Sequence, residues 1–103
     1  MKIFRRVKTE DKLDLVLYSS SVKNPRAVIF LVHGMGEHAK RYAHVIEYFK
    51  NVNIATVAID LRGHGNSEGQ RGHMPSFDHM MHDLTLSLAH VTNDYKGIPV
   101  ILY

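Results

Sequence analysis

The residues best suited to chemistry in this sequence form a polar turn at positions 33–38, with the sequence His-Gly-Met-Gly-Glu-His. The turn directly follows five apolar residues, 28–32, and precedes a helical pattern. Glycines on both sides of Met35 give the backbone access to unusual φ values, so that it can point an N–H group outward. An N–H at a strand end, beside a helix N-terminus, is a favourable place for developing negative charge. The turn therefore predicts a main-chain site for an anionic reaction intermediate.

Histidine is frequent, with eight residues in a chain of 103. His79 and His82 are three residues apart on a predicted helix, but a zinc site needs three or four converging ligands. The sequence contains no cysteine, so we expect no metal site, no disulfide and no thiol nucleophile. We expect His79, His82 and His90 to lie on the solvent side of their helix.

A second candidate is Ser67, at the centre of a literal G-x-S-x-G pattern in residues 65–69. A nucleophile in such a pattern sits on a sharp turn between a strand and a helix. Here three residues separate the pattern from the preceding strand, and residues 70–75 separate it from the following helix. We therefore expect Ser67 to form loop hydrogen bonds. Asp60, at the end of a strand, could act as a general base, but we favour a role in ordering the turn at Arg62 and Gly63.

Composition and charge exclude several other classes. The formal net charge is +3, and the densest basic group lies on a predicted edge strand, so we expect no nucleic-acid partner. Residues 63–68 lack the last glycine of a dinucleotide fingerprint, and no phosphate-loop motif is present, so no cofactor is expected. No apolar run reaches the roughly 20 residues of a membrane helix. Because the start of the chain has no signal-peptide core and cysteine is absent, we expect a cytoplasmic protein.

The elements that must position these residues follow from hydrophobic periodicity. Residues 2–8 and 13–19 predict an antiparallel hairpin at a sheet edge, the second strand having one mostly apolar face. The apolar, β-branched runs at residues 27–32 and 54–59 predict buried parallel strands. An apolar stripe through residues 42, 45, 46 and 49 predicts a helix over 39–51 between them.

A long glycine-containing loop at residues 60–75 precedes a second predicted helix, capped by Ser76 and ended by Gly97. Its expected apolar stripe comprises Phe77, Met80, Met81, Leu84, Leu88, Val91 and Tyr95. Residues 99–103 predict a third buried strand. The fold class is thus α/β, with an N-terminal hairpin joined to a parallel sheet and flanking helices. We expect residues 1–103 to be the N-terminal portion of one larger domain, the alternative being a complete miniature α/β fold.

Two motifs in this order, residues 33–38 followed by Arg41 and Tyr42, and residues 60–69 (D-L-R-G-H-G-N-S-E-G), resemble the α/β-hydrolase superfamily. Within it they are similar to the monoacylglycerol lipase and lysophospholipase group, also classed as serine-aminopeptidase-like. The resemblance covers nearly the whole chain. It implies a serine esterase acting on small ester or lipid substrates, with peripheral membrane contact through the substrate.

The resemblance also implies a role for each residue of the turn. The backbone N–H of Met35 would form one side of an oxyanion hole, and Gly34 and Gly36 would let the loop present it. The side chains of His33, Glu37 and His38 would shape the loop by hydrogen bonding.

The chain departs from the family pattern because the family nucleophile lies after the next buried strand. The serine, acid and base would follow residue 103, so we expect the 103-residue chain to be inactive by itself. Alternatives are an aminopeptidase, a thioesterase, or an epoxide or haloalkane hydrolase, although the last two tend to carry proline at the position of Gly36. A non-enzymatic alternative is a fragment that self-associates through its last strand, residues 99–103.

Overall fold

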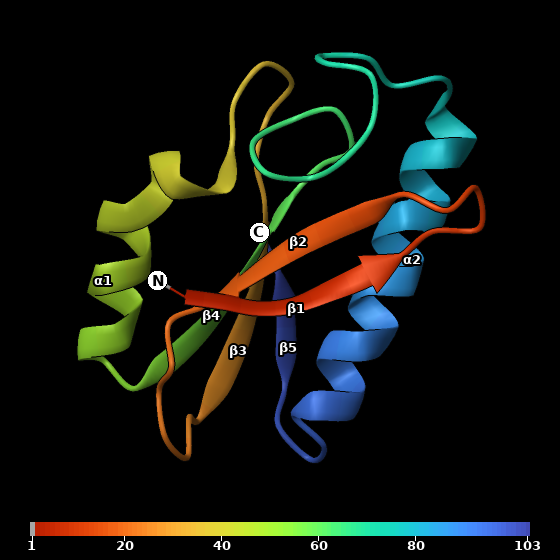
Figure 1. The fold of residues 1–103 in the computed structure, drawn as a ribbon. Coiled ribbons are helices and arrows are strands. Elements are labelled where there is room, and N and C mark those ends of the chain that lie inside the picture. Colours follow the sequence, from red (N-terminus) through yellow and green to blue (C-terminus); the bar gives the residue numbers. More distant parts are fainter. Residues whose placement is uncertain (1) are drawn as a thin grey trace.

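A five-stranded mixed sheet forms the centre of the molecule (Figure 1). The computed structural model describes residues 2–103. The strands, in the spatial order β1-β2-β4-β3-β5, are β1 (Lys2–Lys8), β2 (Asp14–Ser19), β4 (Ile54–Asp60), β3 (Ala27–Val32) and β5 (Val100–Leu102). β1 and β2 form the predicted antiparallel hairpin, and β2 is also antiparallel to β4. β3 is parallel to both β4 and β5, as the strand–helix–strand pattern predicted.

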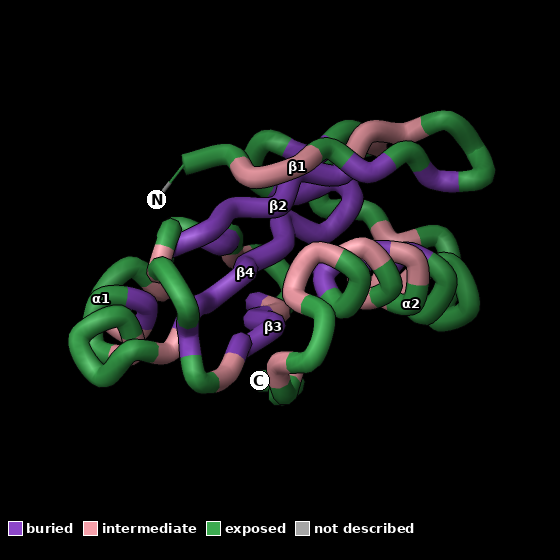
Figure 2. Tube along the Cα trace, turned by 90° about the horizontal axis from the view of Figure 1, so that it is seen from below, coloured by how far each residue is buried: buried purple, intermediate pink, exposed green. Residues whose placement is uncertain are grey.

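Helices cover both faces of this sheet (Figure 1). The predicted helix 39–51 begins as a 3-10 turn, η1 (Ala39–Tyr42), and continues as α1 (Ala43–Asn51). On the opposite face lies α2 (Phe77–Asp94), whose first turn is capped as predicted, because Ser76 Oγ accepts a hydrogen bond from the His79 N–H at 3.1 Å. In Figure 2 the exposed residues gather on the outer surfaces of both helices, while the central strands are buried.

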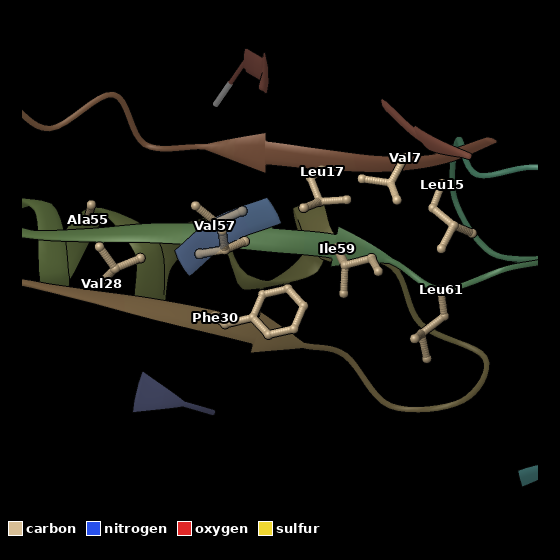
Figure 3. Close-up of a cluster of buried hydrophobic side chains, with 10 residues drawn as sticks. Val7, Leu15, Leu17, Val28, Phe30, Ala55, Val57, Ile59 and Leu61 are labelled. Carbon is tan, nitrogen blue, oxygen red and sulfur yellow. The ribbon is translucent and has the colours of Figure 1, made fainter. Parts of the chain in front are cut away.

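β2 is buried on both faces, which corrects the prediction of one mostly apolar face. Leu15 and Leu17 join the cluster on the α2 side, together with Phe30 and Val57 (Figure 3). Val16 and Tyr18 join the cluster on the α1 side. The reason is that β2 pairs with both β1 and β4 and so lies inside the sheet.

The α2 stripe was predicted only in part. Leu84, Leu88 and Val91 do pack into the core, but Phe77 is 68% exposed and Met81 is 41% exposed. The buried row of the helix is instead Asp83, Ser87 and Val91. Asp83 is buried because it pairs with Arg62 on the facing loop, at 2.8 Å. A buried ion pair thus lies at a position of α2 that the apolar pattern did not include.

β5 forms at the predicted position but is not buried. Val100 is half-buried, and Ile101 and Leu102 are exposed, because β5 is an edge strand paired only with β3 among the described residues. In the described part of the chain, no helix combines the length and apolar character needed to cross a bilayer.

Candidate active site

The loops that carry the two sequence motifs meet at one end of the sheet. β3 and β4 are parallel and in register from Ala27 opposite Ile54 to Val32 opposite Ile59, so both strands end at the same edge. Figure 1 shows the loop after β3 and the loop after β4 side by side there. This is the edge at which open α/β sheets bind their ligands.

At the tip of the first loop, side chains hold the backbone on both sides of Met35. The Gly34 N–H donates to Glu37 Oε1 at 2.9 Å, and the Gly36 N–H donates to His64 Nε2 at 3.0 Å. Among the hydrogen bonds described for residues 2–103, none uses the Met35 N–H. Met35 itself is 56% exposed, and its amide lies between two neighbours whose N–H groups are held by side chains.

His33 joins the end of β3 to the end of β4. Its Nδ1 lies 2.7 Å from the Gly34 carbonyl oxygen, and its Nε2 accepts the Leu61 N–H at 3.0 Å. Because a carbonyl only accepts, Nδ1 carries the hydrogen and the ring is neutral. Burial of the ring lowers the pKa of His33 from its usual value, against opposing effects of the Gly34 carbonyl and Asp60.

Glu37 ties the loop to the start of the following helix. Its carboxylate accepts from the Tyr42 hydroxyl at 2.7 Å and pairs with Arg41 at 3.1 Å. The Tyr42 hydrogen bond, followed by the Gly34 N–H, lowers the pKa of Glu37, and the same carboxylate raises the pKa of Tyr42. Glu37 is therefore an ionised anchor of the loop.

Asp60 orders both loops through hydrogen bonds to its carboxylate. Its carboxylate accepts from the Ala39 N–H at 2.7 Å, the Asn66 N–H at 2.9 Å and the Tyr18 hydroxyl at 2.8 Å. A Cβ atom at Gly65 would lie 2.3 Å from Asp60 Oδ2, so only glycine fits that position. The turn that Asp60 orders is thus the one at Asn66, and not the predicted turn at Arg62 and Gly63.

The structure confirms the loop role predicted for Ser67. Its Oγ accepts the Val16 N–H at 2.8 Å and donates to the Asp60 carbonyl oxygen. The residue is 2% exposed and lies within the long irregular loop between β4 and α2. It is therefore not on a sharp turn that leads directly from a strand into a helix. Both hydrogen-bonding capacities of the hydroxyl are used by backbone groups.

The structure brings five of the six candidate residues of the turn into one arrangement. His33, Gly34, Gly36 and Glu37 all take part in the hydrogen bonds around Met35. The sixth, His38, is exposed and forms no side-chain cap on η1.

Sequence reasoning missed two of the residues that hold this loop. His64 lies within the second motif, and the glycines on both sides of it indicate a tight turn but not its partner. The hydrogen bond from the Tyr42 hydroxyl to Glu37 was not predicted, because Tyr42 fits the apolar stripe of the helix.

Other histidines do not converge with this site. His79 and His82 are exposed on α2, as predicted, while His90 is half-buried. Residues 2–103 contain no group of three or more His, Asp or Glu side chains arranged to hold a metal ion.

The larger cavity lies elsewhere. A volume of about 670 Å³ opens between the turn of the β1–β2 hairpin and α2, lined by residues such as Glu10, Asp11, His82 and Leu86. No residue of the loop around Met35 lines it. The candidate site therefore rests on backbone geometry and not on a hollow in the described residues.

Comparison with known proteins gives a family match over most of the chain. Residues 23–103 match the family described as serine aminopeptidase, S33. A monoacylglycerol lipase from Mycolicibacterium smegmatis is 37% identical over 79 residues, which is 77% of this chain and 28% of that protein. A monoglyceride lipase from Rattus norvegicus is 38% identical over 78 residues, 76% of this chain and 26% of that protein. The chain thus spans about a quarter of the length of these relatives.

A solved structure gives the same result for the fold. A soluble variant of monoglyceride lipase from Saccharomyces cerevisiae, solved in complex with a substrate analog, superposes with a TM-score of 0.82 at 21% identity. The match covers 99% of this chain and 34% of that one. This likeness confirms the predicted fold class, a hairpin joined to a parallel sheet with flanking helices.

Proposed function

The chain belongs to the serine aminopeptidase S33 family of α/β-hydrolases. We therefore propose that the protein containing this chain hydrolyses carboxylic esters of lipids, such as monoacylglycerols or lysophospholipids. The names of the relatives support a lipid ester as substrate, and no cofactor is required. In this proposal residues 1–103 form the N-terminal portion of a single catalytic domain.

The observation that carries the proposal is the main-chain N–H of Met35. It sits at the carboxyl end of a central parallel strand, while side chains occupy the N–H groups on either side of it. Attack on an ester carbonyl places negative charge on the carbonyl oxygen, and a donor fixed in advance stabilises that charge. We assign this role to Met35, with Gly34, Gly36, His33 and Glu37 supporting the loop.

The rest of the reaction would use residues that follow Tyr103. A serine would attack the carbonyl carbon, and a histidine oriented by an aspartate would take the serine proton. The same histidine would return that proton to the departing alcohol, and water would then release the acid. The Met35 N–H and a second N–H beside the serine would hold the oxyanion in both steps.

Ester turnover tests the proposal. The 103-residue chain and the longest protein product that contains it are each incubated with a monoacylglycerol and with a chromogenic short-chain ester. We expect turnover by the longer protein and none above a heat-treated control by the 103-residue chain. Turnover by the short chain alone would disprove the assignment of the nucleophile to later residues.

Substitution of Met35 in the longer protein tests the donor itself. Met35→Pro removes the N–H, and we expect kcat to fall about a hundred- to a thousandfold, the usual cost of losing one oxyanion donor. The matched control Met35→Leu keeps the N–H, so its kcat should stay within about twofold of the original on the same argument. Equal loss in both variants would show that the side chain, and not the amide, matters.

A peptidase is the second candidate, because the matching family is described as serine aminopeptidase. The same oxyanion site would serve an amide carbonyl. Parallel assays with an amino-acid p-nitroanilide and with a monoacylglycerol decide between the two. A higher kcat/KM for the p-nitroanilide would favour the peptidase, and a higher kcat/KM for the monoacylglycerol would favour the lipid esterase.

A third candidate is non-catalytic self-association. β5 presents exposed apolar side chains and pairs only with β3 among the described residues. Such an edge is suited to strand addition by a second copy.

A further inference from the structure

A hydrogen bond between Gly36 and His64 joins the two loops of the candidate site, in addition to the bond between Leu61 and His33 at their bases. The Gly36 N–H donates to His64 Nε2 at 3.0 Å, across 28 residues of sequence. The other ring nitrogen, Nδ1, lies 2.9 Å from the carbonyl oxygen of Arg62. Because that oxygen only accepts, the hydrogen sits on Nδ1 and Nε2 offers its lone pair to Gly36. His64 must therefore be neutral and in one tautomer to hold the loop.

This bond completes a pair of anchors around Met35. Glu37 holds the Gly34 N–H on one side, and His64 holds the Gly36 N–H on the other. Gly36 has a φ of +80°, and no atom beyond its two chain neighbours lies within 4 Å of the position where its Cβ would be. The Glu37 N–H closes the turn by donating to the Gly34 carbonyl oxygen at 3.1 Å, and the hydrogen bond from Gly36 to His64 ties this turn to the second loop.

We propose that His64 is a positioning residue for the oxyanion site, which fixes the direction of the Met35 N–H by holding the Gly36 N–H with a neutral imidazole. The proposal rests on the proposed function in one respect only, the assignment of the Met35 N–H as the oxyanion donor. It adds a second element to the site, because His64 comes from the loop after β4 and not from the loop that bears the donor.

The alternative is that His64 only fills space. Its ring lies 5.3 Å from that of His33, centroid to centroid, and it is 5% exposed, so it does contribute to packing. An apolar side chain of similar size would keep that packing but would have no acceptor for the Gly36 N–H. The two roles therefore give different results with different substitutions.

The charged groups around the ring pair come from three elements. Asp60 at the end of β4 and Glu37 on the first loop both raise the pKa of the neighbouring His33, and His64 lowers it. The Arg62 side chain points away, toward Asp11 and Asp83.

The direct test is an NMR measurement on the ¹⁵N-labelled chain. A scalar coupling between the Gly36 amide nitrogen and His64 Nε2 reports an N–H···N hydrogen bond. The Leu61 N–H bond to His33 Nε2, also 3.0 Å long, supplies an internal control of the same type. We expect both couplings at neutral pH. Absence of the Gly36 coupling while the Leu61 coupling is present overturns the proposal.

Two substitutions separate positioning from packing. His64→Gln places an amide oxygen near the position of Nε2, whereas His64→Leu fills space without an acceptor. We expect exchange of the Gly36 amide hydrogen to quicken at least about fivefold in His64→Leu, as loss of one hydrogen bond implies, and to stay within about twofold in His64→Gln. Equal exchange in both variants overturns the proposal.

In the longer protein the same pair should change kcat and not KM. His64→Leu should lower kcat, and His64→Gln should restore most of it. Unchanged kcat in His64→Leu, with the NMR coupling present in the parent, would refute the positioning role. Failure of the proposed function looks different, because the parent protein would then turn over no ester while the coupling and the exchange rates remained as described.

Discussion

At the scale of single residues, His33 links the candidate site to the stability of the fold. Its ring is buried, neutral and bonded through both nitrogens to backbone groups. Burial lowers the pKa of His33 in the folded state below its unfolded value of 6.5. The unfolded chain therefore binds the proton first as pH falls, and acid favours unfolding through this residue.

The first prediction follows from the lowered pKa of His33 in the folded state. The contribution of His33 is fully present above pH 6.5 and is lost as pH falls from there toward the lower pKa of the folded state. The free energy of unfolding in urea should accordingly be smaller at pH 5 than at pH 8. His33→Asn, which has no titrating ring, should show a shallower difference between the two conditions. An unchanged difference in this variant would mean that other groups cause the pH dependence.

The second prediction concerns two glycines with positive φ. Gly65 has a φ of +50° and Gly72 a φ of +70°, so alanine is strained at both. Only at Gly65 would the new Cβ meet Asp60, at 2.3 Å; at Gly72 nothing lies within 4 Å. We expect Gly72→Ala to cost about 1 kcal/mol of stability and Gly65→Ala about 1–3 kcal/mol more. Chemical unfolding of both variants checks this, and equal losses would contradict the close contact with Asp60.

The sequence predicted the position of the loop at this edge of the sheet but not the hydrogen bonds that hold it. Residues 33–38 were identified from a strand followed by glycines, which is a local pattern. The partnership of Gly36 with His64 joins positions 28 residues apart, and no spacing rule reports such a contact. Asp60 was likewise assigned to the nearest turn, whereas its carboxylate reaches Ala39, Asn66 and Tyr18.

At the scale of elements, α2 shows where the apolar pattern fails. The helix packs a row that includes Asp83 and Ser87, and Asp83 is buried there because Arg62 on the facing loop supplies a positive charge. The Arg62 guanidinium also pairs with Asp11 on the hairpin turn at 2.7 Å. Hydrogen bonds with Asp83 and then Asp11 raise the pKa of Arg62, and Arg62 in turn lowers the pKa of Asp11 well below its usual range. One cation thus connects the hairpin, the loop after β4 and α2.

The third prediction tests this connection. Asp83→Asn removes one partner of a pair whose side chains are 5% and 3% exposed, and leaves a buried charge partly uncompensated. We expect a loss of about 3–5 kcal/mol. The control Asp94→Asn alters the more exposed pair with Arg5, at 36% and 18% exposure, and should cost about 1 kcal/mol or less. Thermal or urea unfolding measures both, and equal costs would argue against a special role of the buried pair.

At the scale of the whole molecule, the sequence predicted the types of the elements but not their order in the sheet. Each buried run predicted a strand, and the alternation of strand and helix predicted parallel pairing. The insertion of β4 between β2 and β3 depends on contacts between distant segments. The same insertion buries both faces of β2, which the alternation of Leu15, Val16 and Leu17 could not reveal.

The fourth prediction concerns the open edge of the sheet. Ile101, Leu102 and Tyr103 are 52%, 69% and 55% exposed, so the 103-residue chain should self-associate as its concentration rises. Light scattering over a concentration series measures this. Ile101→Lys adds a charge to the edge strand and should shift the chain toward monomer. A clean monomer at high concentration in the original chain would refute the prediction.

The burial of β2 on both sides has a consequence for synthesis on the ribosome. The hairpin emerges before the residues that cover its two faces, which lie on η1, α1 and α2, as far along as Val91. Chains emerge at about 5–20 residues per second, so Leu15, Val16 and Leu17 stay uncovered for several seconds. We expect that interval to be the period in which a nascent chain of this sequence binds a holdase chaperone.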